Sequence, residues 1–311
     1  MKIFITGGAG FIGSHLVDHL LKRGEQVLVI DNYETGRRDN LTEHPCLQVI
    51  EGSITERSLV QELMTVYKPD LIIHAAASYK DPDNWQEDSK TNVLGTVNVI
   101  QAAKAVQCTR LIYFQTALCY GLKPKQQPIT LTHPLDPGGS SYAITKTSAE
   151  QFIRLSGLRT ISFRLANAYG PRNISGPLPT FYQRLSEGKA CFVMDTRRDF
   201  IYIDDLVDCV LKAIDNDVQG IYHISSGSDY SIKELFDATL EAMSLQLKRP
   251  VEVRPRNVDD AFTILLDPSC TQNDLQWKTS TPLLAGIKKT IHYYQKYGIV
   301  ETYTHLQGVE N

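Results

Sequence analysis

The sequence lacks features that would each indicate a particular class of protein. Its net charge is −3 and its Lys and Arg residues are scattered, so it has no basic stripe of the kind that a nucleic-acid-binding protein needs. No apolar run approaches the length that spans a bilayer, and the first strand begins at once, with no signal-peptide pattern before it. We therefore expect a soluble, cytoplasmic protein that meets an acidic ligand with individually placed residues.

The six cysteines also lack a pattern. They form no CxxC pair and have no metal-ligand spacing, so no metal site is predicted. Several have apolar neighbours, which is typical of small core residues. There is no internal repeat and no low-complexity tract, and 311 residues suffice for one large domain or two ordinary ones.

What is present begins with a glycine-rich stretch, TGGAGFIG, near the N-terminus. It separates a predicted buried strand, Lys2 to Ile5, from a predicted helix, Phe11 to Lys22. Gly7 and Gly10 are expected to take backbone angles that a Cβ would forbid and to let the backbone approach a pyrophosphate, whereas Gly13 lets the helix pack closely on the strand. The N-terminus of the helix would then stabilise the phosphates.

Asp31 supports the interpretation of this glycine-rich stretch as a dinucleotide-binding motif. It follows a second predicted strand, Gln26 to Ile30, and a dinucleotide-binding fold needs a carboxylate there for the adenosine ribose hydroxyls. Its charge would repel a 2′-phosphate, so we expect NAD rather than NADP. The nearest cations in the sequence are Arg37 and Arg38.

Strands and helices alternate downstream. The predicted strands are Leu47 to Ile50, Asp70 to His74, Leu111 to Phe114 and Thr160 to Leu165, and the predicted helices are Arg57 to Val66, Ser89 to Val106 and one beginning near Tyr142. Such alternation predicts an α/β protein with a doubly wound parallel sheet of the Rossmann type. The sequence pattern changes beyond Ala166, where the Gly- and Pro-containing segments GPRN and SGPLP follow. We predict a dinucleotide-binding domain at 1–166 and a smaller α/β lobe at 167–311, with some segments returning to the sheet.

Tyr142 and Lys146 are the residues most indicative of chemistry. Their spacing places them one turn apart on the same face of a helix. A tyrosine is a poor base at neutral pH, but a neighbouring ammonium and a cationic nicotinamide ring both favour the phenolate. Thr116 follows a predicted strand, where chain ends meet ligands in open α/β sheets, and its hydroxyl is suited to holding a substrate hydroxyl.

These motifs, with HAAA at 74–77, Asn92 in TNVLGT and RLANAYGP at 164–171, resemble the extended short-chain dehydrogenase/reductases. More narrowly, the chain resembles the NAD-dependent epimerase/dehydratase family that acts on nucleotide sugars, over residues 2 to about 297. QTALCYG, PTFYQRL and RDF are similar to sugar-nucleotide enzymes of bacterial O-antigen gene clusters. The family commonly forms homodimers through two long helices, here those around Ser89 to Val106 and Tyr142 to Leu155.

The resemblance implies a role for each matching residue. Thr116 would orient the reacting hydroxyl, Tyr142 would take and return its proton, and NAD would accept and return the hydride. Lys146 would hold the nicotinamide ribose. The residues expected to contact the cofactor are Gly7, Gly10, Phe11, Ile12, Gly13, Asp31, Asn32, Ser53, Ile54, Ala75, Ala76, Ala77, Asn92, Tyr142 and Lys146.

Substrate contacts are expected chiefly from the second lobe, which would bind the nucleotide sugar. Asn167 matches a residue that contacts the nucleotide-sugar phosphate, and Arg198 matches an arginine that pairs with the diphosphate. The family's second diphosphate arginine would stand at Asn257, so either Arg256 substitutes for it or the pyrophosphate is held with one cation fewer. Lys80 is placed to reach either the cofactor or a sugar carboxylate, and a solvated lysine is the alternative.

Two further positions are interpreted through the family. Ser53 stands where an aspartate usually lies near the adenine, so that contact is expected to be either weaker or supplied by the backbone of Ile54. His74 ends a strand near the cofactor, and the family gives this histidine a structural role.

The residues after Thr116 favour one reaction. The family's 4,6-dehydratases place an acid and a base there and its decarboxylases place a glutamate, but this chain has Ala117 and Leu118. We therefore expect an NAD-dependent nucleotide-sugar epimerase that inverts C4 of a UDP-hexose derivative through a 4-keto intermediate. The alternatives are a dehydratase, decarboxylase or 4-keto reductase of the same family, and a non-catalytic dinucleotide-binding regulator.

Overall fold

The computed structural model describes residues 1–257, 260–299 and 302–303. The chain forms two compact units. The first contains Met1–Cys119, Ser140–Arg164 and Asn216–Tyr222, and the second contains Tyr120–Gly139, Leu165–Asp215 and His223–Asn311. The division into domains at 1–166 and 167–311 stays a prediction.

A seven-stranded sheet organises the first unit, in the order β11-β6-β5-β4-β1-β2-β3. Its strands are β1 (Lys2–Thr6), β2 (Gln26–Asp31), β3 (Leu47–Glu51), β4 (Leu71–His74), β5 (Arg110–Thr116), β6 (Arg159–Leu165) and β11 (Gly220–Ile224). β1 pairs in parallel with β2 and with β4, so that Thr6 lies opposite both Ile30 and His74. The α/β fold class is confirmed.

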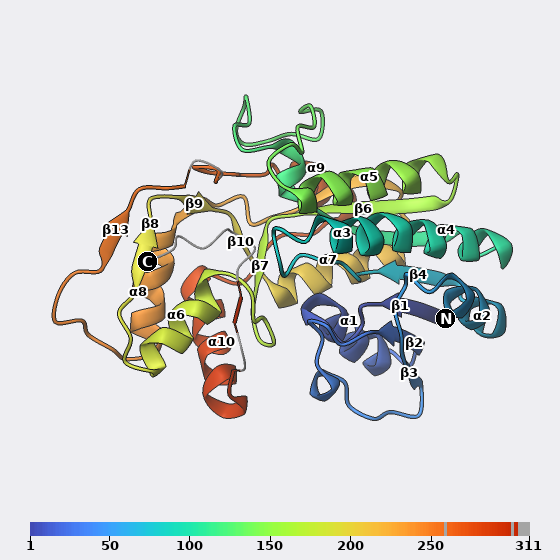
Figure 1. Cartoon of the computed structure of the whole chain (residues 1–311), viewed down its shortest axis with the longest axis horizontal. Coiled ribbons are helices and arrows are strands. Elements are labelled where there is room, and N and C mark those ends of the chain that lie inside the picture. The colour runs from blue at the N-terminus through green and yellow to red at the C-terminus, as the bar shows by residue number, and fades with distance from the viewer. Residues whose placement is uncertain (258–259, 300–301, 304–311) are drawn as a thin grey trace. The chain divides into compact units, whose positions relative to one another are not determined.

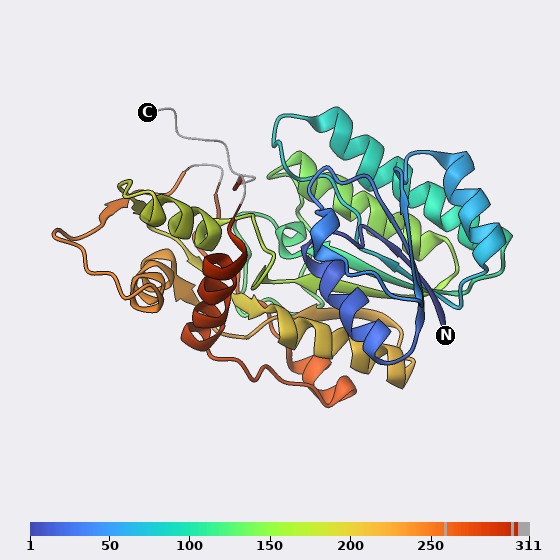
Figure 2. The same cartoon turned by 90° about the horizontal axis from the view of Figure 1, so that it is seen from below.

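Helices cover both faces of this sheet, which is why its central strands are apolar along their whole length. They are α1 (Phe11–Lys22), α2 (Arg57–Tyr67), α3 (Trp85–Asp88), α4 (Thr96–Ala105) and α5 (Ser141–Leu155). Figures 1 and 2 show α2, α4 and α5 together on one face and α1 on the other. The core under α2, α4 and α5 includes Phe4, Ile72, Val99, Tyr113 and Ile153.

Two elements of the first unit differ from the sequence-based expectation. The predicted helix from Ser89 to Val106 begins with a π-helical turn, Ser89–Gly95, and only then continues as α4. Hydrophobic spacing does not distinguish a π turn from an α turn over so few residues. Strand β11 joins the edge of the sheet from beyond residue 166, and its position was not predicted individually.

The second unit contains short strands and five helices among its described residues. The strands are β7 (Asn167–Tyr169), β8 (Phe192–Met194), β9 (Arg197–Arg198), β10 (Phe200–Tyr202), β12 (Tyr230–Ser231) and β13 (Glu252–Arg254). The helices are α6 (Pro177–Ser186), α7 (Ile203–Asn216), α8 (Ile232–Ala242), α9 (Ser269–Leu275) and α10 (Leu283–Tyr297). The strands form the pairs β7–β10, β9–β12 and β8–β13, and α8 packs against both α6 and α10.

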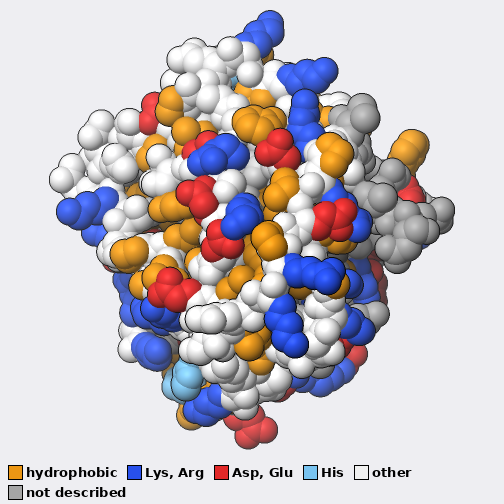
Figure 3. All heavy atoms as spheres, turned by 90° about the vertical axis from the view of Figure 1, so that its left-hand side faces the viewer, with side chains coloured by type: hydrophobic (Ala, Val, Ile, Leu, Met, Phe, Trp, Pro, Cys, Tyr) orange, Lys and Arg blue, Asp and Glu red, His pale blue; other side chains and the backbone are white. Residues whose placement is uncertain are grey.

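The surface agrees with the scattered charge of the sequence. On the face drawn in Figure 3, Lys and Arg side chains are interspersed with Asp, Glu and hydrophobic ones. Within the described residues, no helix has the length and apolar character to cross a membrane. All six cysteines are free thiols. Cys108, Cys119 and Cys209 are buried, as expected of core residues, whereas the other three are only partly buried.

Candidate active site

The glycine-rich turn between β1 and α1 is held by close backbone contacts. Gly7 has a φ of +68°, and a Cβ there would lie 2.6 Å from the backbone nitrogen of Ala76. A Cβ on Gly13 would lie 2.2 Å from the carbonyl oxygen of Gly7. The expectation for Gly10 was wrong in one respect, because its φ of −73° is open to any residue. Its constraint is proximity, since a Cβ would lie 3.2 Å from the Gly7 oxygen.

The N-terminus of α1 fits a pyrophosphate. No side chain caps this end of the helix, and no acidic residue lies in its first turn. The backbone N–H groups of the first turn, which includes Phe11 and Ile12, lack intrahelical partners and carry the positive end of the helix dipole. A dinucleotide phosphate is the group that such an end accommodates.

Asp31 lies beside this turn at the end of β2. Its Oδ2 accepts the backbone N–H of Ala9 and its Oδ1 accepts that of Tyr33, each at 2.8 Å. Burial raises the pKa of the carboxyl, and the backbone N–H groups of Tyr33, Ala9 and Gly10 counter that shift. These three N–H donors leave one of the four lone-pair positions of the carboxylate for a ribose hydroxyl.

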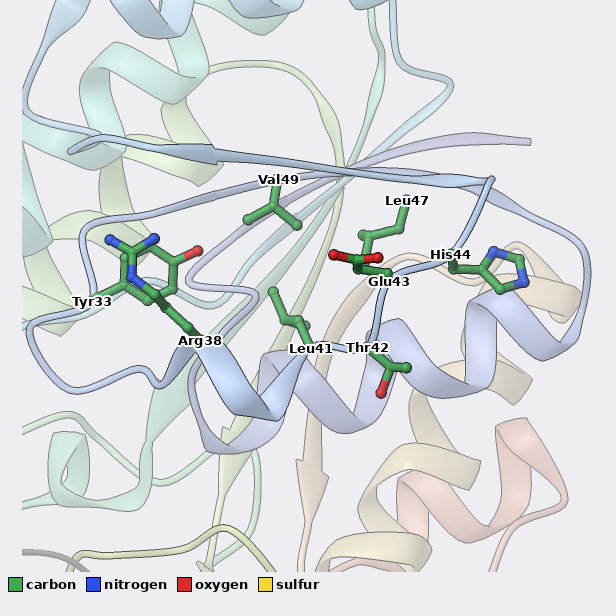
Figure 4. A pocket seen from close by; sticks show the side chains of 8 residues that line it. All are labelled: Tyr33, Arg38, Leu41, Thr42, Glu43, His44, Leu47 and Val49. Carbon is green, nitrogen blue, oxygen red and sulfur yellow. The ribbon is translucent and has the colours of Figure 1, made fainter.

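The two nearby arginines are both occupied. Arg37 donates to the carboxylate of Asp39. Arg38 pairs with Glu51 at 2.6 Å and lies over the ring of Tyr33, 4.1 Å from its centroid (Figure 4). Figure 4 also shows the open hollow beside this stack, which is lined by Tyr33, Arg38, Leu41, Thr42, Glu43, His44, Leu47 and Val49. None of the residues predicted to contact the cofactor lines it.

His74 is locked by two hydroxyls. Its Nδ1 lies 2.6 Å from Thr6 Oγ1 and its Nε2 lies 2.9 Å from Thr96 Oγ1. Burial, and then the charge of Lys146, lower the pKa of His74 to about 3, so its ring is neutral. The same Thr6 hydroxyl accepts the backbone N–H of Ala76, which fixes the start of the 75–77 loop. This is the structural role that the resemblance implied.

Asn92 secures the loop that follows. Its Oδ1 accepts the backbone N–H of Ser78 at 2.9 Å, and its Nδ2 donates to the Ser78 carbonyl at 3.0 Å and to Thr145 Oγ1 at 3.1 Å. Both Nδ2 protons are therefore used inside the first unit. The π turn containing Asn92 lies between Ser78 and α5, and its position depends on this amide.

The remaining predicted cofactor residues lie at the surface or in turns. Asn32 is exposed and accepts the backbone N–H of Glu34. The Oγ of Ser53 lies 2.8 Å from Thr55 Oγ1. Ile54 is buried, and its carbonyl accepts from Asn98 at 3.0 Å, which leaves its N–H as the group to consider for an adenine contact.

Thr116, Tyr142 and Lys146 all lie in the first unit. Thr116 ends β5, and its Oγ1 accepts the backbone N–H of Leu118 at 3.2 Å, so its own proton can be donated to a substrate oxygen. Ser140 caps α5 by accepting the N–H of Ala143, and this cap sets the start of the helix that carries the other two residues. Tyr142 packs against the ring of Tyr79.

The ionisation of this pair differs from the expectation. Burial, and then the nearby Tyr79 and Asp88, raise the pKa of Tyr142 rather than lowering it. Burial also lowers the pKa of Lys146 to about 7, and Glu150 opposes that shift. The expectation considered the ammonium but not the burial of the pair, which disfavours both charged forms. The protein's own groups thus hold Tyr142 neutral, and the cationic nicotinamide ring remains the second charge that would favour the phenolate.

Sequence analysis missed three buried residues around this pair. Asp88 accepts the hydroxyl of Ser78 at 3.0 Å, and burial raises its pKa. Glu150 and Tyr113 flank Lys146 from α5 and β5. Glu150 could have been found, because it lies one further turn along the helix face that carries Tyr142 and Lys146. Nothing in the sequence distinguishes Tyr113 from any other apolar strand residue.

Two of the three predicted substrate residues of the second unit, Arg198 and Arg256, contact Asp260. Arg198 forms an ion pair with the Asp260 carboxylate and donates to the carbonyl of Ala261 at 3.0 Å. Arg256 donates to the backbone carbonyl of Asp260 at 2.9 Å. Asn167 is exposed and donates to the carbonyl of Asp199 through its backbone N–H at 2.9 Å. Lys80, in the first unit, is exposed as well.

A model of the family described as "NAD dependent epimerase/dehydratase family" matches residues 3–225. The crystal structure of the Bordetella bronchiseptica enzyme WbmH in complex with NAD⁺ has a TM-score of 0.93 and 51% identity, covering 96% of this chain and 99% of that one. The structure of WbmG from the same organism, in complex with NAD and UDP, has a TM-score of 0.92 and 42% identity, covering 99% of each chain.

Two relatives illustrate the reactions that similar proteins catalyse. A UDP-glucose 4-epimerase of Mycolicibacterium smegmatis is 28% identical, over 95% of this chain and 99% of the relative. UDP-glucuronic acid decarboxylase 5 of Arabidopsis thaliana is 32% identical, over 92% of this chain and 87% of the relative. The chain is thus similar to enzymes that epimerise and to enzymes that decarboxylate a UDP-sugar.

Proposed function

The chain belongs to the NAD-dependent epimerase/dehydratase family, and on that premise we propose that it inverts C4 of a UDP-hexose derivative through a 4-keto intermediate. It is an NAD-dependent enzyme of nucleotide-sugar chemistry. The observation that carries the proposal is the combination of a Thr116 hydroxyl with a free proton, the Tyr142–Lys146 pair on one helix face, and the absence of a titratable side chain at positions 117 and 118.

Each functional residue of the first unit would have its own role in the proposed epimerisation. Bound NAD supplies the site that accepts a hydride from C4 and returns it. Tyr142 takes the proton of the C4 hydroxyl and later gives it back, while Thr116 donates a hydrogen bond to the same oxygen and holds it in place. In its protonated form, Lys146 places a positive charge beside Tyr142 and favours the phenolate. Asp31 would bind the adenosine ribose of the cofactor, and the uncapped N-terminus of α1 would bind its pyrophosphate.

The turn after Thr116 favours epimerisation over elimination. Ala117 and Leu118 begin a 3₁₀ turn, Ala117–Tyr120, and neither side chain can carry a proton. Dehydration needs an acid for the leaving hydroxyl and a base for the neighbouring carbon, whereas epimerisation needs only a rotation of the keto sugar. Asp88 is a buried carboxylate that acts electrostatically on Tyr142, and one of its oxygens accepts the hydroxyl of Ser78. A decarboxylase remains the alternative because one relative at 32% identity is such an enzyme.

Substrate phosphates are proposed to bind to the second unit. Arg198 and Arg256 both contact Asp260, one at its carboxylate and one at its carbonyl, which brings two guanidinium groups to one residue. Arg198 is held by an ion pair and several carbonyls, so a diphosphate would share or replace the Asp260 contact. This arrangement supports Arg256 as the substitute for the arginine missing at position 257.

A homodimer is proposed from the first unit alone. Apolar side chains are exposed along the π turn and α5, including Leu94 (50%), Ile144 (47%), Phe152 (42%) and Leu155 (81%). A second copy would bury them. Sedimentation of wild type against a Phe152→Asp, Leu155→Asp double variant tests this, with a dimer expected only for wild type. A cytoplasmic location and a role in O-antigen synthesis remain proposals.

The direct test is product analysis on a substrate panel. The purified protein is incubated with UDP-, GDP- and dTDP-hexoses, with their N-acetyl and uronic acid forms, and products are followed by NMR. Inversion at C4 of one UDP-sugar, with no change in its other substituents, supports the proposal. Turnover only of a uronic acid with release of CO₂ would establish the decarboxylase instead.

A further inference from the structure

Lys146 is held by a buried aromatic ring that nothing in the sequence singled out. Its Nζ lies 4.1 Å from the ring centroid of Tyr113, a residue of β5 with no exposed surface. The hydroxyl of the same ring donates to the backbone carbonyl of Lys146 at 3.0 Å. One side chain therefore fixes both the backbone and the ammonium of Lys146.

The ring replaces solvent that the ammonium has lost. Lys146 is only 2% exposed, so few water molecules can hydrate its charge. The negative face of an aromatic ring attracts a desolvated cation. Burial raises the pKa of Tyr113 well above its usual value, so the ring acts through its quadrupole and carries no charge.

The other groups around Lys146 are either already hydrogen-bonded or neutral. On its own helix, Glu150 favours the charged form, but its carboxylate already accepts from Arg164 of β6 at 2.7 Å and from the hydroxyl of Ser162. On β4, His74 is neutral, with its ring centroid 5.6 Å from that of Tyr113. Tyr142, one turn before Lys146, is also neutral, and its ring packs against that of Tyr79.

We propose that Tyr113 is a positioning residue, whose ring face keeps the Lys146 ammonium charged and whose hydroxyl fixes the helix turn that carries it. The inference deepens the proposed function, in which Lys146 must be charged beside Tyr142. It also predicts that the enzyme tolerates Phe at position 113 far better than any aliphatic residue.

Direct titration of Lys146 tests the proposal. The protein is labelled with ¹³C at the lysine ε carbons, and the Lys146 signal is assigned by its loss in Lys146→Met. In Tyr113→Phe, which keeps the ring, the titration midpoint is expected to stay near the wild-type value. In Tyr113→Leu it should fall by about 0.5 to 1.5 pH units, the range that a cation–π contact implies. Because no substrate is present, the result holds whether or not the epimerase reaction does.

Two controls keep the test decisive. Phe114→Leu removes a ring from the opposite face of the same strand, where it stacks on Phe163, and should leave the midpoint unchanged. If Tyr113→Leu does not fold, 3,4,5-trifluorophenylalanine at position 113 weakens the ring face without changing its shape, and its midpoint should lie below that of Tyr113→Phe. A midpoint in Tyr113→Leu equal to that of wild type, or one in the fluorinated variant equal to that of Tyr113→Phe, overturns the proposal. A fall in Tyr113→Phe as large as in Tyr113→Leu overturns the role of the ring.

Discussion

The Arg164 guanidinium and the Glu150 carboxylate form an ion pair of 2.7 Å inside the first unit, with side chains 3% and 0% exposed. Ser162 donates to the same carboxylate, so all three groups are satisfied without water. The pair connects β6 to the helix that carries Tyr142 and Lys146. It is therefore a support for the candidate active site as well as for the fold.

Removing one partner of this pair should be severely destabilising. Arg164→Met leaves Glu150 buried and unpaired, and the expected loss is about 3–5 kcal/mol in the free energy of unfolding, measured with urea at pH 7. A Glu150→Leu, Arg164→Met double variant should regain most of it. Lys233→Met, which breaks the exposed pair with Asp237, should change stability by no more than about 0.5 kcal/mol. An Arg164→Met protein as stable as wild type would mean that the pair is open to solvent.

NAD should bind more tightly than NADP, by roughly 10²-fold, because a 2′-phosphate would approach the Asp31 carboxylate. Arg37 and Arg38 are paired with Asp39 and Glu51 and do not offset that repulsion. Calorimetric titration of wild type with both cofactors measures the ratio, and Asp31→Ser should reduce it. Tighter binding of NADP to wild type would refute the assignment.

Tyr142→Phe should keep the fold and the cofactor while losing about 10²-fold or more of turnover, since it deletes only the hydroxyl that transfers the proton. Circular dichroism and the NAD content of the purified protein check that the variant is intact. Tyr67→Phe, which removes a hydroxyl from α2, is the matched control and should remain active. Near-wild-type turnover of Tyr142→Phe would assign the proton transfer to another group.

Local sequence pattern was enough to predict the elements that we propose bind the cofactor. The glycine turn, α1 and the end of β2 at Asp31 are short-range features, and the structure places them within a residue of the prediction. The features that could not be predicted from the sequence depend on contacts between segments that are distant in the chain. The ring of Tyr113 acquires its role only because α5 packs on β5, and the raised pKa of Tyr142 comes from burial that a helix face does not reveal. The Arg198–Asp260 ion pair joins residues 62 apart in the chain, a contact that spacing cannot predict.

The central claim is that the enzyme oxidises C4 and returns the same hydride without elimination, and one measurement in heavy water tests it most directly. The substrate identified in the panel is converted in D₂O, and the product is analysed by mass spectrometry and NMR. The account predicts a product of unchanged mass, with inverted configuration at C4 and no deuterium at any ring carbon. A product lighter by water or by CO₂, or deuterium at C5, would show that an acid or base reaches the sugar and would contradict C4 epimerisation.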